Sequence, residues 1–115
     1  MTQKRILIAN RGEIALRIIR SAKEMDLHTI AVYSDADEDA LHTKRADESY
    51  YLGGSLPAES YRNLKKLVKA AEETNADLVH PGYGFLAENA DFAKAVEKKG
   101  ITWVGPKPET IKSMG

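Results

Sequence analysis

Short apolar runs alternate along the chain with longer segments in which apolar residues recur every three or four positions. The runs are rich in β-branched residues, a pattern typical of strands that are buried on both faces of a parallel sheet. They cover residues 6–9, 29–33, 77–80 and 101–104. Residues 49–52, which precede two glycines, form a weaker fifth candidate. We therefore predict about five strands.

The segments with helical spacing separate these strands. Residues 13–25 and the segment that follows Ser60 have apolar positions on one face, and Ser60 is a candidate N-cap for a helix that runs to about Thr74. Asn89 is a candidate N-cap for a further helix that ends at Gly100. Weaker patterns predict a short helix over 38–46 and a last helix opened by Pro106 and Pro108.

Strands and helices alternate from one end of the sequence to the other. This order predicts an α/β fold, namely a Rossmann-like three-layer domain with a mostly parallel sheet of about five strands and right-handed crossovers. A length of 115 residues fits one such domain and one core.

Composition narrows the possible functions. Seventeen Lys and Arg balance 17 Asp and Glu, so no net positive field favours nucleic acid or an anionic membrane. The chain has no cysteine, which excludes disulfides, thiolate metal sites and a cysteine nucleophile. Its first apolar run is too short to cross a membrane. We expect a cytoplasmic protein without nucleic-acid or membrane partners.

Residues 10–13 connect the first strand to the first helix, where a dinucleotide would bind in a Rossmann fold. Such loops use three glycines in the pattern G-x-G-x-x-G, whereas here Gly12 stands between Arg11 and Glu13. Gly12 is therefore interpreted as a structural turn. A free-standing Rossmann-like nucleotide-binding module is kept as the alternative function.

The segment 80–89 carries the most informative loop, because two glycines flank Tyr83 after a His-Pro pair. The glycines permit positive φ on both sides of Tyr83, so the backbone can approach a ligand closely. A tight connection in which Tyr83 only covers the sheet end is an equally good interpretation at this point. His80 by itself is typical of a hydrogen-bonded residue at a strand end.

The acidic residues Asp35, Asp37, Glu38 and Asp39 follow the second strand. They lack the glycine and terminal glutamate of a calcium loop, and we interpret them as a solvated turn. A receiver-like phosphoacceptor role for Asp35 or Asp37 ranks last, because that residue is expected after a third strand. The three histidines have no zinc spacing, so no metal site is predicted.

The first helix carries Glu13, Arg17, Arg20 and Glu24 opposite its apolar stripe. Two i,i+4 pairs of opposite charge are expected, each contributing about 0.2–0.5 kcal/mol. The face is interpreted either as solvated or as a contact surface for another subunit.

Two long motifs identify a family. They are IANRGEIA at 8–15 and HPGYGFLAEN at 80–89, accompanied by ADE at 46–48 and VGP at 104–106. With these motifs the whole chain resembles the amino-terminal domain of biotin carboxylase, as found in acetyl-CoA, propionyl-CoA, methylcrotonyl-CoA, pyruvate and urea carboxylases. The resemblance implies a Rossmann-like domain that precedes an ATP-grasp module.

The resemblance also implies a reaction. In the full enzyme ATP, with magnesium, activates bicarbonate as carboxyphosphate, and the carboxyl group passes to N1′ of biotin on a carrier protein. The family's catalytic, ATP-binding and metal-binding residues come from segments downstream of this domain. We therefore expect residues 1–115 to contain no catalytic residue, to bind no cofactor tightly and to be inactive without the ATP-grasp and carboxy-terminal parts.

Site residues follow from the same resemblance. Tyr83 and Gly84 are expected to face the substrate in a wall of the biotin pocket. Four residues are expected to shape that loop, namely His80, Gly82, Glu88 and Asn89. The resemblance further implies a homodimer whose interface includes Arg17, Arg20 and Glu24.

Overall fold

A computed structural model describes residues 3–54, 60–82 and 86–105 of the chain. The strands are β1 (Arg5–Ile8), β2 (His28–Tyr33), β3 (Glu48–Tyr51), β4 (Leu78–His80) and β5 (Thr102–Trp103). The helices are α1 (Gly12–Glu24), α2 (Leu41–Arg45), α3 (Leu64–Glu73) and α4 (Ala90–Lys98), with a short 3-10 turn, η1, over Asp35–Asp37.

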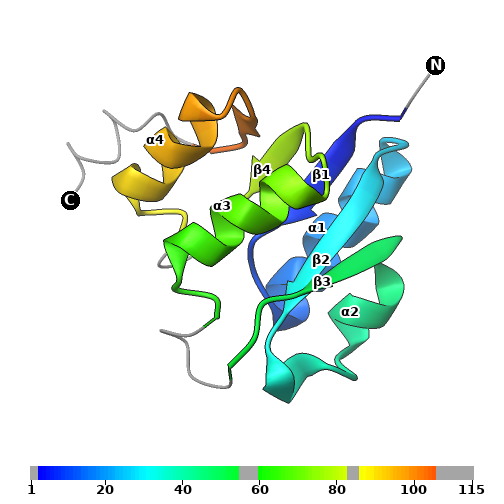
Figure 1. The fold of residues 1–115 in the computed structure, drawn as a ribbon. Coiled ribbons are helices and arrows are strands. Elements are labelled where there is room, and N and C mark those ends of the chain that lie inside the picture. The colour runs from blue at the N-terminus through cyan, green and yellow to red at the C-terminus, as the bar shows by residue number, and fades with distance from the viewer. Residues whose placement is uncertain (1–2, 55–59, 83–85, 106–115) are drawn as a thin grey trace.

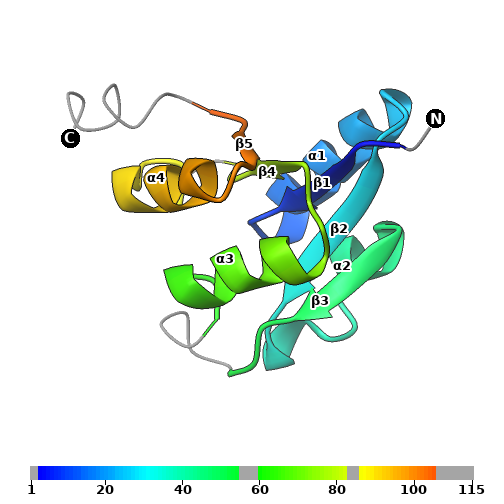
Figure 2. The same cartoon turned by 45° about the horizontal axis from the view of Figure 1, so that its top comes forward.

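The five strands form one sheet in the order β3-β2-β1-β4-β5, and every pairing in it is parallel. Helices α1 and α2 lie on one face of this sheet, and α3 and α4 lie on the other (Figures 1 and 2). The predicted three-layer α/β fold is therefore confirmed. The first strand lies in the centre, so the loop that follows it has neighbours on both sides.

The pleat of the strands divides the core into two layers. In β1, Leu7 belongs to the cluster that packs under α3 and α4, whereas Ile6 and Ile8 belong to the cluster under α1. The α3/α4 layer is much the larger and includes Phe92, whose ring meets Trp103 edge-on at a centroid distance of 5.4 Å. The two faces of the sheet are thus covered to different extents.

Two predicted boundaries differ from the structure. The helix predicted to begin after Ser60 begins at Leu64, and its N-cap is Asn63, whose side chain accepts a hydrogen bond from the Lys66 amide at 3.1 Å. Ser60 is instead fully buried in the preceding turn, where its carbonyl accepts from the Asn63 amide. The helix predicted over 38–46 is reduced to α2, and the one predicted after Pro106 lies outside the described residues.

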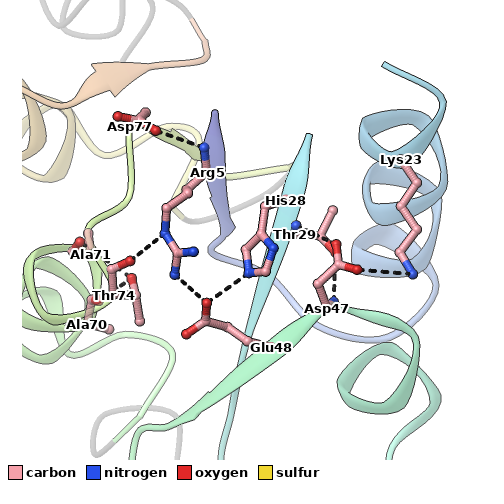
Figure 3. A network of polar contacts seen from close by, with 10 residues as sticks. All are labelled: Arg5, Lys23, His28, Thr29, Asp47, Glu48, Ala70, Ala71, Thr74 and Asp77. Carbon is pink, nitrogen blue, oxygen red and sulfur yellow. Dashed lines mark hydrogen bonds and ion pairs between the residues drawn. The ribbon is translucent and has the colours of Figure 1, made fainter. Parts of the chain in front are cut away.

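At the amino ends of the strands, charged side chains link strand to strand (Figure 3). One carboxylate oxygen of Glu48 in β3 is hydrogen-bonded both to the Arg5 guanidinium of β1 and to Nε2 of His28 in β2. Arg5 also donates to the Thr74 carbonyl at 2.8 Å, which joins the end of α3 to the sheet. This network holds the edge of the sheet that lies opposite the strand-to-helix loops.

Asp47 strengthens the same edge. Its carboxylate accepts hydrogen bonds from the backbone amide and the hydroxyl of Thr29, both at 2.9 Å. The hydrogen bond from the Thr29 amide lowers the pKa of Asp47. Burial acts to raise the pKa of Glu48, but the hydrogen bonds from His28 and Arg5 outweigh it and the pKa falls. The Asp47-Glu48 pair in the sequence therefore has a structural role here.

Candidate functional site

The loops that follow the strands meet at the carboxyl edge of the sheet. In open parallel sheets this is the edge where ligands bind. Residues 9–12 follow β1, residues 34–37 follow β2, and Pro81 and Gly82 follow β4. Because β2, β1 and β4 are neighbours, the β1 loop lies between the other two.

The β1 loop is built around Arg11 and Gly12. Arg11 is extended, with φ −136° and ψ 171°, and Gly12 then has φ +63°, a left-handed conformation that favours glycine. The predicted structural turn at Gly12 is confirmed. The Gly12 amide donates to Nδ1 of His42 at 3.4 Å, so a protein side chain meets the start of α1.

Arg11 pairs with Asp37 across the ends of β1 and β2. Its Nε and Nη2 atoms donate to the two carboxylate oxygens at 2.7 and 2.6 Å, and the Tyr61 hydroxyl donates to the same carboxylate at 2.7 Å. The hydrogen bond from Arg11 lowers the pKa of Asp37, while burial raises the pKa of Tyr61. The Arg11 guanidinium also lies 5.7 Å from the Tyr61 ring centre. These side chains occupy the edge where a dinucleotide would be expected.

This cluster corrects the prediction of a solvated acidic turn. Asp35, Glu38 and Asp39 are exposed as predicted, but only 8% of the Asp37 side chain is exposed. No group of three or more potential metal ligands occurs in the described parts of the chain. The sequence missed the pairing because Arg11 and Asp37 are separated by 26 positions and become neighbours only through the parallel pairing of β1 and β2.

His42 completes this side of the edge. It is buried, and its Nε2 lies 3.2 Å from the Val32 carbonyl. Burial lowers the pKa of His42, so the ring is neutral at pH 7, with Nε2 donating to Val32 and Nδ1 accepting from Gly12. The sequence offered no partner for this histidine, and the structure assigns it to holding α2 under the β1 loop.

On the other side of the β1 loop, Asn10 holds the beginning of the glycine-tyrosine-glycine loop. The Asn10 side-chain amide donates to the Pro81 carbonyl at 2.9 Å, and the Gly82 amide donates to Nδ1 of His80 at 3.0 Å. Gly82 has φ +70°, and a Cβ atom there would lie 2.6 Å from the Asn10 amide nitrogen and 2.9 Å from Ile14. The two long sequence motifs are therefore in direct contact.

The remaining predicted site residues fall into separate places. Tyr83 and Gly84 lie outside the described residues. Glu88 is exposed in the turn before α4, and Asn89 caps that helix as predicted, because its side chain accepts from the Phe92 amide at 2.9 Å. Hydrogen bonds thus hold the segment 80–89 at its start, through His80 and Gly82, and at its end, through Asn89.

Arg17, Arg20 and Glu24 are exposed on α1, as predicted. The two expected i,i+4 ion pairs are not formed: within the described segments, neither Glu13 with Arg17 nor Arg20 with Glu24 comes within 4.0 Å. Such exposed pairs contribute so little that solvation of the separate charges competes with them. These four charges remain available to other molecules.

Comparison with known proteins identifies the domain. The family described as "Biotin carboxylase, N-terminal domain" matches residues 2–111. The chain belongs to this family. The predicted resemblance is confirmed, and it extends across both motifs that meet at the carboxyl edge.

Three similar proteins illustrate the relationship. Biotin carboxylase 1 of Bacillus subtilis (strain 168) is 53% identical over 112 residues, which cover 97% of this chain and 25% of that protein. The biotin-dependent acyl-coenzyme A carboxylase alpha3 subunit of Mycobacterium leprae (strain TN) is 50% identical over 96% of this chain and 19% of its own length. The crystal structure of the K. lactis urea amidolyase superposes with a TM-score of 0.95 at 45% identity, covering 97% of this chain and 7% of that chain. The chain therefore spans a quarter or less of these proteins.

In the described residues no helix is long and apolar enough to cross a lipid bilayer.

Proposed function

We propose that the chain works as the amino-terminal domain of a biotin carboxylase, the ATP-dependent ligase that carboxylates carrier-bound biotin with bicarbonate. In this proposal it supplies one wall of the biotin pocket and a face of the enzyme dimer. The partners are the ATP-grasp and carboxy-terminal parts of the enzyme, a biotin carboxyl carrier, and a second copy in a homodimer.

The observation that carries this proposal is the contact between the two family motifs. The Asn10 side-chain amide donates a hydrogen bond to the Pro81 carbonyl, and Gly82 packs so closely on Asn10 and Ile14 that an added Cβ would force one of these side chains to shift. This contact fixes the backbone from which Tyr83 follows. It supports a loop that presents Tyr83 and Gly84 to the substrate.

His80, Gly82, Glu88 and Asn89 are assigned to shaping that loop. His80 and Gly82 form one end through the amide hydrogen bond, and Asn89 forms the other as the cap of α4. Glu88 is exposed and lies directly before this cap. A loop held at both ends loses less conformational entropy when a substrate binds.

The described residues do not fit ATP or magnesium. The start of α1 has Arg11 and Glu13 where a bound phosphate would need small residues. In addition, Nδ1 of His42 already accepts a hydrogen bond from the Gly12 amide. The described acids do not form a cluster that could hold a metal ion. We assign nucleotide, metal and catalytic groups to other parts of the carboxylase, which also weakens the alternative of a nucleotide-binding module.

Arg17, Arg20 and Glu24 are proposed for the dimer face. All three are exposed on α1 and none is engaged in an ion pair with a described residue, which supports an external partner. Reversing the charge with Arg20→Glu in a full-length parent should shift the dimer towards monomer in sedimentation velocity. An unchanged dimer equilibrium would assign this face to solvent. The cytoplasmic location stays a prediction from the sequence.

A chimera tests the function. The matching 112 residues of B. subtilis biotin carboxylase 1 are replaced by this chain, and biotin-dependent ATP cleavage is measured with bicarbonate and free biotin. We expect activity in the chimera and none in the isolated 115-residue chain. An inactive but folded chimera would contradict the proposal, and micromolar binding of ATP or NAD to the isolated chain in calorimetry would favour the alternative.

A further inference from the structure

The backbone ladder between β1 and β4 ends where the glycine-tyrosine-glycine loop begins. Its last bond runs from the Ala9 amide to the His80 carbonyl at 2.9 Å. In a regular parallel ladder with this register, the Gly82 amide would next donate to the Ala9 carbonyl, and the Arg11 amide to the Gly82 carbonyl. Both amides donate to side chains instead. The Gly82 amide binds Nδ1 of His80 at 3.0 Å, and the Arg11 amide binds Oδ1 of Asn10 at 2.8 Å.

The Asn10 side chain takes the place of the next ladder bond. Its Nδ2 donates to the Pro81 carbonyl at 2.9 Å while its Oδ1 holds the amide that follows it in the chain. The backbone then turns at Gly82, with φ +70°, in contact with the same side chain. Beyond β2 and β3, by contrast, backbone still binds backbone, because the Asp35 amide donates to the Gly54 carbonyl at 3.2 Å. The direction of the chain after β4 therefore depends on Asn10.

An amide is the side chain that this position requires. One of its atoms must donate to the Pro81 carbonyl and another must accept from the Arg11 amide, and a primary amide offers both within one short side chain. A carboxylate of the same shape has two acceptors and would face the carbonyl oxygen with like charge. Asn10 is only partly buried, so these two hydrogen bonds, rather than packing in the core, explain the residue type.

Arg11 holds Asn10 in this orientation. The Arg11 guanidinium is bound through two nitrogens to Asp37, whose carboxylate also accepts from the Tyr61 hydroxyl. Bidentate ion pairs of this kind are strong and specific in geometry. Because the Arg11 amide is the donor to Oδ1 of Asn10, an anchored Arg11 favours the Asn10 rotamer that faces Pro81. The cluster at the end of β2 is thus joined to the loop after β4 by direct contacts.

We propose that Asn10 is a positioning residue for biotin, and that Arg11 and Asp37 hold it in place. The proposal rests on the proposed function, because that function places biotin against the loop that Asn10 turns. Asn10 acts on biotin through the backbone of Pro81 and Gly82. The KM for biotin should therefore respond to its substitution, whereas the KM for ATP should not, since the nucleotide site is assigned to other parts of the carboxylase.

Asn10→Asp in the B. subtilis chimera tests the role. The variant keeps an acceptor for the Arg11 amide and replaces the donor to Pro81 by a carboxylate oxygen. We expect the KM for free biotin to rise at least about fivefold, the effect of one lost hydrogen bond, with the KM for ATP unchanged. The control is Asn63→Asp, the same chemical change at a helix cap where the side chain is an acceptor, and neither KM should change.

An unchanged KM for biotin in Asn10→Asp, or an equal rise of both KM values, would overturn the proposal. If Asn10→Asp unfolds the chimera, Asn10→Ser replaces it. The hydroxyl can still accept from the Arg11 amide but is too short to replace the bond to Pro81, so the same change confined to biotin is expected.

A double variant tests the part of Arg11 and Asp37. Asp37→Asn alone should raise the KM for biotin about threefold, because it loosens Arg11 and through it Asn10. Added to Asn10→Asp, it should raise that KM little further, since both substitutions act through one contact. Effects that multiply in the double variant would show that Asp37 acts independently of Asn10.

Amide hydrogen exchange provides a second readout that does not need activity. Exchange of the Gly82 amide in the folded chimera, followed in peptides that span the loop, should be at least about tenfold faster in Asn10→Asp and unchanged in Asn63→Asp. Equal exchange in Asn10→Asp and the wild type would contradict the positioning of the loop.

The two readouts let the two proposals fail separately. An inactive chimera in which Asn10→Asp accelerates exchange contradicts the proposed function and retains the positioning of the loop. An active chimera in which Tyr83→Ala raises the KM for biotin but Asn10→Asp does not retains the function and removes the role of Asn10.

Discussion

The two edges of the sheet use charged side chains in different ways. At the amino edge, Arg5 and Glu48 connect elements that the backbone ladder already fixes in register. At the carboxyl edge, Arg11–Asp37 and Asn10–Pro81 connect loops that lie beyond the last paired residues of the strands. The geometry of the carboxyl edge therefore depends on a few side chains, and substitutions there should cost more than at the amino edge.

The largest effect is expected at Gly82. Gly82→Ala adds a Cβ that meets Asn10 and Ile14 in a left-handed backbone conformation, so we expect a loss of about 2–4 kcal/mol of unfolding free energy. The control is Gly100→Ala, where φ is also positive but no atom lies within 4 Å of the added Cβ. In urea unfolding, this control should lose about 1–2 kcal/mol of unfolding free energy. Equal losses would mean that the contact with Asn10 is not tight.

A second pair of variants compares the edges directly. Asp37→Asn removes a nearly buried carboxylate from Arg11 and Tyr61, and we expect a cost of about 1.5–3 kcal/mol. Glu48→Gln removes a carboxylate that is 36% exposed, and we expect a cost below about 1 kcal/mol. Chemical denaturation measures both. A larger loss for Glu48→Gln would reverse the proposed difference between the edges.

The pH dependence of stability sharpens this comparison. The pKa of Asp37 is lowered in the folded state, so its contribution is complete above its ordinary value of 3.8 and is lost as the pH falls through the folded value. The gap in unfolding free energy between the wild type and Asp37→Asn should be constant from pH 7 to about 5 and should shrink below about 4. A gap independent of pH down to 2 would contradict the ion pair.

Small effects on stability are also expected at the helix caps. Asn89→Ala and Asn63→Ala each remove one side-chain bond to a helix amide, and each should cost about 1 kcal/mol. Only Asn89 ends the glycine-tyrosine-glycine loop, so only its variant should raise the KM for biotin in the chimera. Equal changes in KM would argue against a role of Asn89 in shaping the loop.

Much of the fold could be predicted because its signals are local. The apolar runs and the helical spacing lie within a few residues of one another, and the cap at Asn89 directly precedes its helix. The start of α3 was misplaced because Ser60 and Asn63 are both good N-caps. The choice between them depends on tertiary contacts, since the Tyr61 hydroxyl is bonded to Asp37 and Val32.

The site was only partly predictable, because its contacts join residues that are far apart in the sequence. The motif residues at 80–89 were recognised, but their contact with Asn10 requires the pairing of β1 with β4, which are about 70 residues apart. The pairing of Arg11 with Asp37 likewise depends on the strand order.

The central claim is that this domain contributes to the biotin site and leaves ATP to other parts of the enzyme. The most direct measurement is the pair of apparent KM values, for free biotin and for ATP, in the chimera with and without Tyr83→Ala. We expect the biotin value to rise about tenfold, equivalent to about 1.4 kcal/mol of lost binding, while the ATP value stays unchanged. An unchanged biotin value, or a rise confined to ATP, would contradict the account.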